Sequence, residues 1–414
     1  MTKHIPLTLQ FNQVRAVTES LCKPLDVEDY SIQVDWFASP PKWHLAHTTW
    51  FFESFILEKY YKNYHPFDEQ FSYLFNSYYF SKGERLTQSE RRVLSRPLIN
   101  KIYEYREYVN RHVAELLDGP NEAINKLLVL GLNHEQQHQE LLLQDIKYNF
   151  GSSPLNPTYI EKDFSFSDEI EAQKFLKIDE GVYEIGHDSN LFCFDNEKGL
   201  HKQYIHGTEI ADRLVTNREF KGFINDGGYE NPLLWLSDGW DWKEKNNITS
   251  PLYWKNIDGC WHYFTLHGMR KCDPAAPVTH ISYYEANAFA RWAGYRLPTE
   301  FEWEVASKLY FDSNEKSNLL ESESYLALPR VNGDTSFIGN LWEHTESAYL
   351  PYPMYRQDKG ALGEYNGKFM INQMVLRGGS FATPSTHIRK TYRNFYYPNA
   401  RWNFSGIRLA KDND

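Results

Sequence analysis

The sequence predicts an α+β protein in two parts, a helical bundle followed by an irregular α+β domain. Its 414 residues exceed what one hydrophobic core usually organises, so two domains are expected. Up to about residue 149, apolar residues recur at three- and four-residue steps, whereas beyond it short β-like runs alternate with turn residues. We therefore expect a bundle over residues 1–150, a linker over 151–174 and a second domain over 175–414.

Four segments of the first part carry the helical period, and they cover residues 5–23, 42–61, 97–116 and 121–149. In the third, Pro97 suits a first helical turn and Ser95 suits a cap. The apolar residues of that helix are Leu98, Ile102, Tyr105, Val109, Val113 and Leu116. Four such helices fit an up-and-down bundle with a long connection over 62–94.

The second part begins after a stretch of mixed Gly, Pro, Ser and charged residues, "FGSSPLNPTYIEKDFSFSDEIEAQ", which is typical of a linker. Runs such as "GVYEIG" and "MVLRGGSF" then predict short strands between turns. Helices are expected at about 283–294 and 299–308. This half is thus predicted to be irregular α+β with long loops.

Charge and composition indicate small-molecule partners. The net charge is −11 and the pI about 5.8, so no basic face suggests nucleic acid or anionic lipid. The N-terminal stretch lacks the apolar core of a signal peptide, and no run approaches the roughly 20 apolar residues of a membrane helix. We therefore expect a cytoplasmic protein without a membrane partner; its oligomeric state stays open, a homo-oligomer included.

The four cysteines are scattered without a CxxC pair, which argues against a disulfide framework and against a structural zinc knuckle. They are expected to be buried thiols, and they are Cys22, Cys193, Cys260 and Cys272.

The segment "NHEQQHQELLLQDIKYN" places His134 and His138 one helical turn apart. Two histidines at i and i+4 share a helix face and can both reach one metal ion. The alternative is the polar stripe, or the satisfied core histidines, of an ordinary helix. A third histidine on another helix of the bundle would favour the metal.

"PPKWHLAHTTWFFESF" offers that third ligand, with His44 and His47 among Trp and Phe residues. Bundles commonly build metal sites from side chains on facing helices. We predict His47 as the ligand and a capping or packing role for His44, although position alone does not separate the two.

Three neutral imidazoles suit zinc, copper, nickel or ferrous iron, so the ligand set does not choose the metal. A hydrolytic zinc site would need a nearby carboxylate base, and Glu135 or Glu140 could serve. Metal-dependent hydrolysis therefore stays an alternative on residue chemistry alone.

The motifs resemble a known family. "HLAHTTWFFE" together with "NHEQQHQELLLQDI" is similar to the DinB-like iron domain of ergothioneine-pathway sulfoxide synthases. "RLPTEFEWE", "GNLWE", "LRGGSFATP" and "RWNFSGIRLA" resemble the C-type-lectin-like domain of formylglycine-generating enzymes, and the two domains occur in this order in the sulfoxide synthases. "LFNSYYFSKGERLTQSERRVLSRP" and "GEYNGKFMINQMVLRGGS" also look like that family, so the resemblance covers most of the chain.

The resemblance implies an iron-dependent enzyme. It would join a thiol, cysteine being the expected donor, to an imidazole carbon of hercynine (Nα-trimethylhistidine) and oxidise the sulfur to a sulfoxide with O2. The implied ligands of Fe(2+) are His47, His134 and His138. A six-coordinate ferrous ion with three protein ligands leaves three positions for the reactants.

The same resemblance implies roles for three residues of the bundle. Gln137 matches the residue that holds the histidine-derived substrate; otherwise it is an exposed helix glutamine. Tyr78 and Tyr79 match tyrosines that face the iron, where a phenol can deliver a proton; otherwise they are two core aromatics.

A quaternary ammonium needs ring faces or a loosely placed carboxylate, because it forms no hydrogen bond. The stretch "RNFYYPNARWNFSG" is rich in rings, and the family places it over the iron site. We predict Trp402, Asn403 and Phe404 for the hercynine pocket.

The carboxylate of the thiol substrate calls for arginine, whose planar fork pairs it bidentately. The resemblance leads us to expect two arginines three residues apart after the double tyrosine. Arg91 occupies the second position, whereas Gln88 occupies the first, and Arg85 or Arg96 could compensate. The departure leaves the donor open, so a selenoneine synthase that uses a seleno-sugar is an alternative.

The second domain lacks the chemistry of its namesake. Formylglycine formation needs cysteines near the C-terminal motifs, but Phe381 follows "RGGS" and Cys272 is the last cysteine. We therefore predict that this domain is a substrate-covering scaffold. An ovothiol-type enzyme acting on histidine, and a non-catalytic ligand-binding module with structural histidines, are the remaining alternatives.

Overall fold

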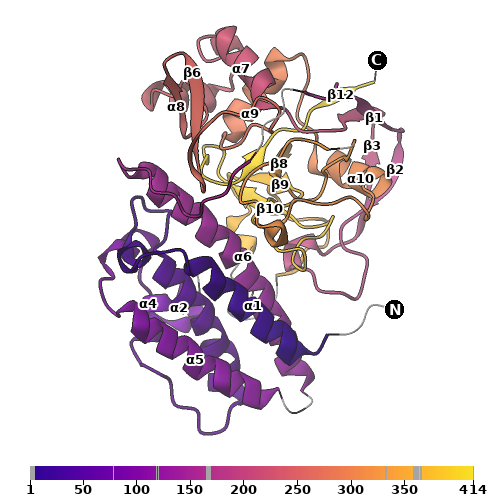
Figure 1. The fold of residues 1–414 in the computed structure, drawn as a ribbon. Coiled ribbons are helices and arrows are strands. Elements are labelled where there is room, and N and C mark those ends of the chain that lie inside the picture. Colours follow the sequence, from indigo (N-terminus) through magenta and orange to yellow (C-terminus); the bar gives the residue numbers. More distant parts are fainter. Residues whose placement is uncertain are drawn as a thin grey trace. The chain divides into compact units, whose positions relative to one another are not determined.

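The structure is a computed structural model that describes residues 5–77, 79–117, 119, 121–164, 169–331, 333–357, 363 and 366–413. The chain forms two compact units, which divide between Ile160 and Glu161. The expected α+β class is confirmed, with helices in the first unit and mixed helices and sheets in the second (Figure 1). Within the described ranges, no helix combines the length and hydropathy that a membrane crossing requires.

Four long helices build the first unit. They are α1 (Leu7–Cys22), α2 (Pro41–Phe52), α5 (Ile99–Leu116) and α6 (Glu122–Ser152). α2 packs against α5 and α6, and α6 also packs against α1. The shorter elements are η1 (Val27–Ser31), η2 (Glu53–Leu57), α3 (Glu58–Tyr60), α4 (Phe71–Phe75), η3 (Phe80–Lys82) and η4 (Gln88–Val93), so the connection expected over 62–94 contains three short helical turns.

Helix α2 lies at the centre of the unit. Pro41 starts it, where a missing N–H costs nothing, and all its residues are buried. A helix that is surrounded on every side by protein belongs to a core. Its end runs into the π-helical turn η2, where Glu53 is buried and accepts hydrogen bonds from the hydroxyls of Tyr64 (2.6 Å) and Tyr105 (2.5 Å).

The predicted cap of the third helix is wrong. α5 begins at Ile99 with Leu98 as its N-cap residue, so Ser95 lies outside the helix and Pro97 precedes the cap. The Ser95 side chain therefore lies too far upstream to reach the free N–H groups of the first turn. The periodic apolar face was predicted correctly for Ile102, Tyr105, Val109 and Val113, which are buried, whereas Leu98 is exposed and Leu116 is half-buried.

Helix α6 has a clear start and a close contact that depends on glycine. The Asn121 side chain accepts hydrogen bonds from the N–H groups of Ala123 and Ile124. A Cβ atom at Gly131 would lie 2.6 Å from a ring carbon of Phe52 and 2.9 Å from one of Phe51. Glycine thus lets α6 approach α2 one turn before the histidines.

The second unit contains four sheets and four helices of three turns or fewer among its described residues. The sheet orders are β1-β4-β12, β10-β9-β8-β11, β2-β3 and β5-β6-β7, and all pairs are antiparallel except β8 with β11. The helices are α7 (Asn217–Asn225), α8 (Ser237–Lys245), α9 (Tyr283–Trp292) and α10 (Glu300–Tyr310). The strands are β1 (Phe175–Ile178), β2 (Gly181–Ile185), β3 (His201–Ile205), β4 (Thr208–Ala211), β5 (Trp254–Ile257), β6 (Cys260–Thr265), β7 (Gly268–Lys271), β8 (Trp342–Ala348), β9 (Met374–Arg377), β10 (Asn394–Tyr396), β11 (Ser405–Gly406) and β12 (Ala410–Asp412).

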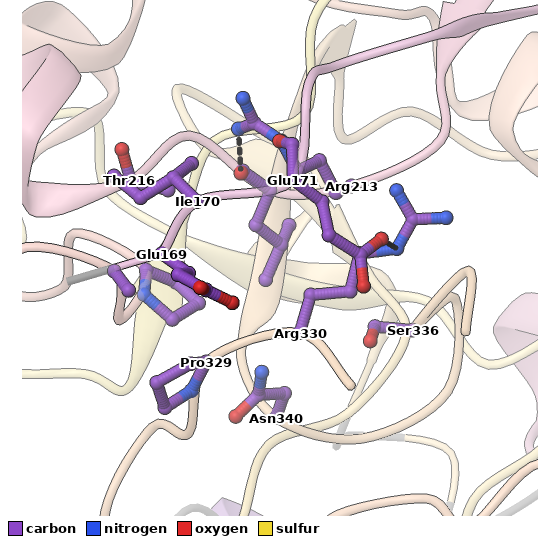
Figure 2. Close-up of a pocket in the computed structure, with 12 residues that line it drawn as sticks. Glu169, Ile170, Glu171, Arg213, Thr216, Pro329, Arg330, Ser336 and Asn340 are labelled. Carbon is purple, nitrogen blue, oxygen red and sulfur yellow. Dashed lines mark hydrogen bonds and ion pairs between the residues drawn. The ribbon is translucent and has the colours of Figure 1, made fainter. Parts of the chain in front are cut away.

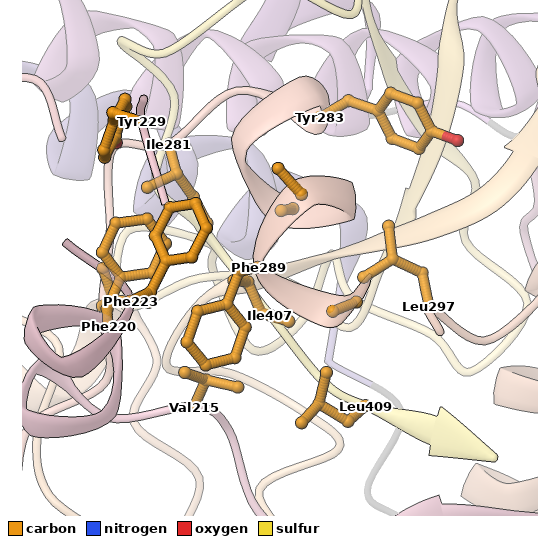
Figure 3. Packing of buried hydrophobic residues seen from close by; sticks show 14 of the residues in the cluster. Val215, Phe220, Phe223, Tyr229, Ile281, Tyr283, Phe289, Leu297, Ile407 and Leu409 are labelled. Atoms are coloured by element: carbon orange, nitrogen blue, oxygen red, sulfur yellow. The ribbon is translucent and has the colours of Figure 1, made fainter. Parts of the chain in front are cut away.

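A large apolar core holds α7 and α9 together in this unit (Figure 3). The rings of Phe220 and Phe289 stack with centroids 5.4 Å apart, and Phe223 packs edge-on to Phe289. Val215 and Leu409 belong to the same cluster. The helices predicted at about 283–294 and 299–308 correspond to α9 and α10, and both begin with a Ser or Thr capping box.

The motifs quoted from the C-terminal half contribute to two buried ion pairs. Trp303 donates through Nε1 to Glu343, and Arg408 pairs with the same carboxylate at 2.6 Å. Glu304, one residue after Trp303, pairs with Arg377 of the "LRGG" string. These residues therefore contribute to the packing of the unit.

The cysteines fit the prediction only in part. Cys22 is buried, Cys193 and Cys272 are half-buried, and all four thiols are free. Cys260 is exposed, so the expectation of four buried thiols is wrong at that position. It begins β6 next to the β5–β6 turn, where the side chain turns to solvent.

Candidate metal centre

Three histidines of the first unit converge in its core. His47 comes from α2, and His134 and His138 come from α6. One nitrogen of each lies within 4.8 Å of one nitrogen of each of the others, and all three side chains are buried. The structure thus brings together the three residues that the sequence analysis selected, including the choice of His47 over His44.

A backbone carbonyl fixes the imidazole of His47. Its Nδ1 lies 2.6 Å from the carbonyl oxygen of Phe75, and since a carbonyl only accepts, Nδ1 must carry the proton. The neutral ring then presents a lone pair at Nε2. Trp43 and Trp50 stack on the ring with centroid distances of 4.5 and 5.6 Å, so its orientation is held as well.

His44 lies beside the cluster and contacts one of its members. Its Nδ1 is 2.9 Å from Nδ1 of His138, and its Nε2 is 2.9 Å from Oδ2 of Asp145. The sequence pattern predicts a capping or packing role for His44 and assigns no role to Asp145. A signal was present, because Asp145 follows His138 by seven residues, two turns along the same helix face.

Burial keeps the three imidazoles neutral. Loss of solvation lowers the pKa of His134 to about 4 and holds the pKa values of His47 and His138 well below the usual 6.5. The neutral form is the one whose lone pair binds a metal cation. Three converging neutral nitrogens therefore fit a divalent first-row metal, ferrous iron among them.

The carboxylate of Glu135 is engaged elsewhere. It accepts hydrogen bonds from Arg15 (2.8 Å), Arg106 (3.1 Å) and Thr18 (2.7 Å), all inside the bundle. Despite burial, these partners lower the pKa of Glu135 to about 2. A carboxylate held by two guanidinium groups is a poor base, so Glu135 does not support the hydrolytic alternative.

The second carboxylate of that alternative, Glu140, is also buried. It accepts a hydrogen bond from Nε2 of Gln144 at 3.3 Å, one turn further along α6.

Gln137, predicted to hold substrate, lies half-buried on the turn that joins His134 to His138.

Arg91 contacts Trp43, which stacks on His47 of the histidine cluster. Its guanidinium carbon is 3.3 Å from the centre of the Trp43 ring, and its terminal nitrogens donate to the hydroxyls of Ser39 (2.7 Å) and Ser77 (3.0 Å). Gln88, on the same short helix η4, is half-buried and donates to the carbonyl of Phe37 at 3.2 Å. Arg85 lies over the ring of Phe80, and Arg96 is exposed.

Tyr79 is buried, and the ring of Trp50 contacts both Tyr79 and His47. Its ring packs against Trp50, with centroids 5.7 Å apart, and against Phe55, at 5.1 Å. The Asn76 side chain holds the backbone of Tyr79 through its N–H and its carbonyl. Tyr78 lies outside the described residues.

The residues predicted for the hercynine pocket belong to the second unit. Phe404 is fully buried and packs on Phe381, with centroids 4.4 Å apart, so it contributes to the core there. Asn403 is also fully buried, and its amide forms no hydrogen bond with the described residues. Trp402 is half-buried and meets Tyr396 edge-on.

The second unit has a pocket of its own, lined by Arg213 and Arg330 (Figure 2). Arg213 pairs with Glu219 at 2.8 Å, and Arg330 pairs with Asp212 at 2.8 Å. Glu171 approaches both arginines, with its carbonyl toward Arg213 and its carboxylate toward Arg330. Each guanidinium of the pocket thus already has an acidic partner.

Comparison with known proteins agrees with the two-part architecture. The family model of the sulfatase-modifying factor enzyme 1-like domain matches residues 162–325 and 329–413. Hercynine oxygenase from Mycolicibacterium smegmatis is 31% identical over 309 residues, which cover 68% of this chain and 71% of that protein. Hercynine oxygenase from Mycobacterium tuberculosis is 28% identical, with 71% of this chain and 73% of that protein covered.

A third relative, ergothioneine biosynthesis protein 1 from Schizosaccharomyces pombe, is 30% identical over 234 residues, which cover 53% of this chain and 28% of that protein. The family match spans more than half of the chain, and the bacterial relatives extend across both units. The chain therefore belongs to the hercynine oxygenase family, the sulfoxide synthases of ergothioneine biosynthesis.

Proposed function

We propose that this protein is a non-haem iron(II) oxygenase that joins hercynine to a thiol, cysteine in the first instance, and forms the sulfoxide. The observation that carries the proposal is the buried cluster of His47, His134 and His138, in a chain of the hercynine oxygenase family. Hercynine, the thiol and O2 give the coupled sulfoxide and one water: one C–H and one S–H bond break, and a C–S and an S–O bond form.

The three histidines would hold Fe(2+) through their neutral nitrogens. The iron supplies a site where O2 and both organic substrates can be bound and activated together. The protein's own contribution is orientation. Trp43 and Trp50 fix the ring of His47, and burial keeps bulk water away from all three ligands.

Other residues would bind the substrates and move a proton. Gln137 would hold hercynine, and Arg91, with Gln88 nearby, would bind the carboxylate of the donor. The phenol of Tyr79, or of Tyr78, would deliver a proton to the reacting oxygen. Trp402, Asn403 and Phe404 would offer ring faces and an amide to the trimethylammonium end.

Oxygen consumption by the iron-loaded protein tests the proposal. The full-length chain is loaded with ferrous iron without air, and O2 uptake is followed with hercynine plus cysteine, γ-glutamylcysteine or a seleno-sugar. We expect uptake coupled to a product with a new C–S bond, identified by mass spectrometry. The panel also separates cysteine from a selenium donor, and histidine in place of hercynine tests the ovothiol-type alternative.

Two variants provide the controls. His134→Ala should lose both iron and turnover, whereas His112→Ala should retain them. His112 lies half-buried on α5, and among the described residues its ring nitrogens bond only to the Tyr108 carbonyl of its own helix. Absence of turnover with every donor would refute the oxygenase. A folded wild-type protein without affinity for iron would instead indicate a ligand-binding module.

A further inference from the structure

Three buried groups, Asp145, His44 and His138, form an unbroken chain that ends at the proposed metal site. Oδ2 of Asp145 lies 2.9 Å from Nε2 of His44, and Nδ1 of His44 lies 2.9 Å from Nδ1 of His138. His44 is 2% exposed and Asp145 4% exposed. His138 is one of the three residues whose nitrogens converge. Because these groups are buried, their proton positions are determined by one another rather than by hydrogen bonds to bulk water.

We propose that Asp145 and His44 are positioning residues, which fix the imidazole of His138 in the tautomer that presents Nε2 to the metal. This inference rests on the proposed metal centre and adds to it two residues that the family resemblance did not assign. It follows from counting donors and acceptors along the chain.

An ionised carboxylate only accepts hydrogen bonds, so Nε2 of His44 must carry a proton. In a neutral ring the other nitrogen, Nδ1, then has the lone pair. Nδ1 of His138 must therefore donate to it, and Nε2 of His138 is left with a lone pair. Reversal of every proton would place the lone pair of His44 against the carboxylate, which is repulsive, and would put a proton on the ligating nitrogen of His138.

The surroundings of Asp145 favour its role as acceptor. The N–H of Ser39 donates to the same Oδ2 at 2.8 Å, and the hydroxyl of Ser39 accepts from Arg91. Burial raises the pKa of Asp145 above its usual value, and the donors His44 and Ser39 and the positive charge of Arg91 act in the opposite direction. The carboxylate is thus built into a network of donors.

His47 provides an internal comparison. Its Nδ1 donates to the Phe75 carbonyl, a neutral acceptor, so the lone pair of the neutral ring lies on Nε2. His138 has instead an imidazole backed by a carboxylate, a stronger acceptor, which should make its Nε2 more basic. The two ligands are therefore held in the same tautomer by different partners.

Nitrogen NMR of the metal-free, full-length protein tests the tautomer directly. With 15N-labelled histidine, we expect His138 to carry its proton on Nδ1 and His44 to carry its proton on Nε2, with signals assigned from His138→Gln and His44→Asn. If His44 and Asp145 only packed against each other, His138 would not need to carry its proton on Nδ1. A proton on Nε2 of His138 in protein that binds iron would overturn the proposal.

Metal affinity provides the second readout, with cobalt(II) as a spectroscopic probe. His44→Phe keeps a ring but removes the acceptor, so affinity should fall on the order of 10- to 100-fold, the range typical of outer-shell partners. His44→Asn, whose short side chain offers an acceptor to His138 but does not reach Asp145, should lose less. His112→Phe is the matched control and should bind cobalt as wild type does.

The outcomes separate this proposal from the proposed function. Wild-type protein that binds neither iron nor cobalt would refute the metal centre, whatever its tautomers. Wild-type affinity in His44→Phe would refute the relay and leave the metal centre standing. If His44→Phe does not fold, the NMR measurement on the unaltered protein still decides the question.

Discussion

Arg91 and Trp43 lie in direct contact, with the guanidinium carbon 3.3 Å from the centre of the indole ring. Trp43 in turn stacks on His47 at 4.5 Å, so the arginine is separated from a proposed iron ligand by one ring. Two serine hydroxyls hold the guanidinium from the other side. An arginine fixed in this way is suited to bind an anion beside the metal, because its donors are already oriented.

We predict that Arg91→Lys weakens binding of the sulfur donor and leaves hercynine binding unchanged. Lysine keeps the charge but loses the planar fork, so the donor carboxylate is under-paired in a buried place, at a cost on the order of 2 to 5 kcal/mol. Apparent affinities for both substrates, measured from rates of O2 uptake, decide it. The exposed neighbour Arg92 provides the control, as Arg92→Lys. Equal losses of affinity for both substrates would show that Arg91 does not bind the donor carboxylate specifically.

Gln88→Arg tests the same site in the opposite direction. The second guanidinium that the family resemblance leads us to expect would be restored, so use of cysteine should improve if cysteine is not the natural donor. The ratio of kcat/KM between donors is the measurement. An unchanged ratio would show that Gln88 does not take part in donor selection.

Tyr79→Phe should bind iron and both substrates as wild type does but form less sulfoxide. The ring volume against Trp50 and Phe55 is kept, and only the phenolic proton is lost, a change worth roughly 10²- to 10⁴-fold where a general acid acts in the slow step. Thiol oxidation without coupling should increase. Product ratios by mass spectrometry report this, with the partly exposed Tyr73→Phe as control. Tyr78→Phe belongs in the same series, and full coupling in both variants and in the double variant would remove the tyrosines from the mechanism.

Glu135→Gln should destabilise the bundle strongly. Arg15 and Arg106 would each lose a charged partner inside the core, and breaking a buried ion pair on one side costs about 3 to 5 kcal/mol. Urea unfolding of the metal-free protein measures the loss. Glu104→Gln, at an exposed pair with Lys101, should change stability by less than about 1 kcal/mol. Similar midpoints for the two variants would contradict the assignment.

Glu304 should contribute to acid unfolding of the second unit. Arg377, Lys308 and the N–H of Gly186 outweigh burial and lower its pKa below the usual 4.5. A carboxylate with a depressed pKa in the folded state stabilises above pH 4.5, and this stability is lost as the pH falls through the lower, folded-state value. The stability gap between wild type and Glu304→Gln should therefore shrink on acidification, followed by urea midpoints. A gap independent of pH would exclude Glu304, and the exposed Glu184→Gln should show no gap.

Local pattern was enough to predict the four helices and the meeting of His134 and His138 with a histidine of α2. The period of apolar residues is a property of each helix, and i, i+4 spacing is a distance along one of them. The choice between His44 and His47 needed the family resemblance, because both lie on one turn of α2. What separates them physically is the partner: His44 reaches Asp145 of α6, whereas His47 reaches the carbonyl of Phe75 in α4.

The sequence was insufficient to predict which residues pair when they lie far apart along the chain. Glu135 follows His134 directly and was a reasonable base, yet Arg15 lies 120 residues away along the chain and engages it. No spacing rule indicates such a pair. The Ser95 cap failed for a local reason, since the start of α5 at Ile99 is set by the chain around Pro97 rather than by the nearest serine.

The burial of α2 has a practical consequence for redesign. Every position from Pro41 to Leu57 is core, so a library of variants should show low tolerance to substitution on both sides of His47. Arg85 and Gln88 are only half-buried and lie on or near the short turn η4, where backbone changes disturb few neighbours. If these residues select the donor as we propose, donor preference can change there while the helix that carries His47 stays unchanged.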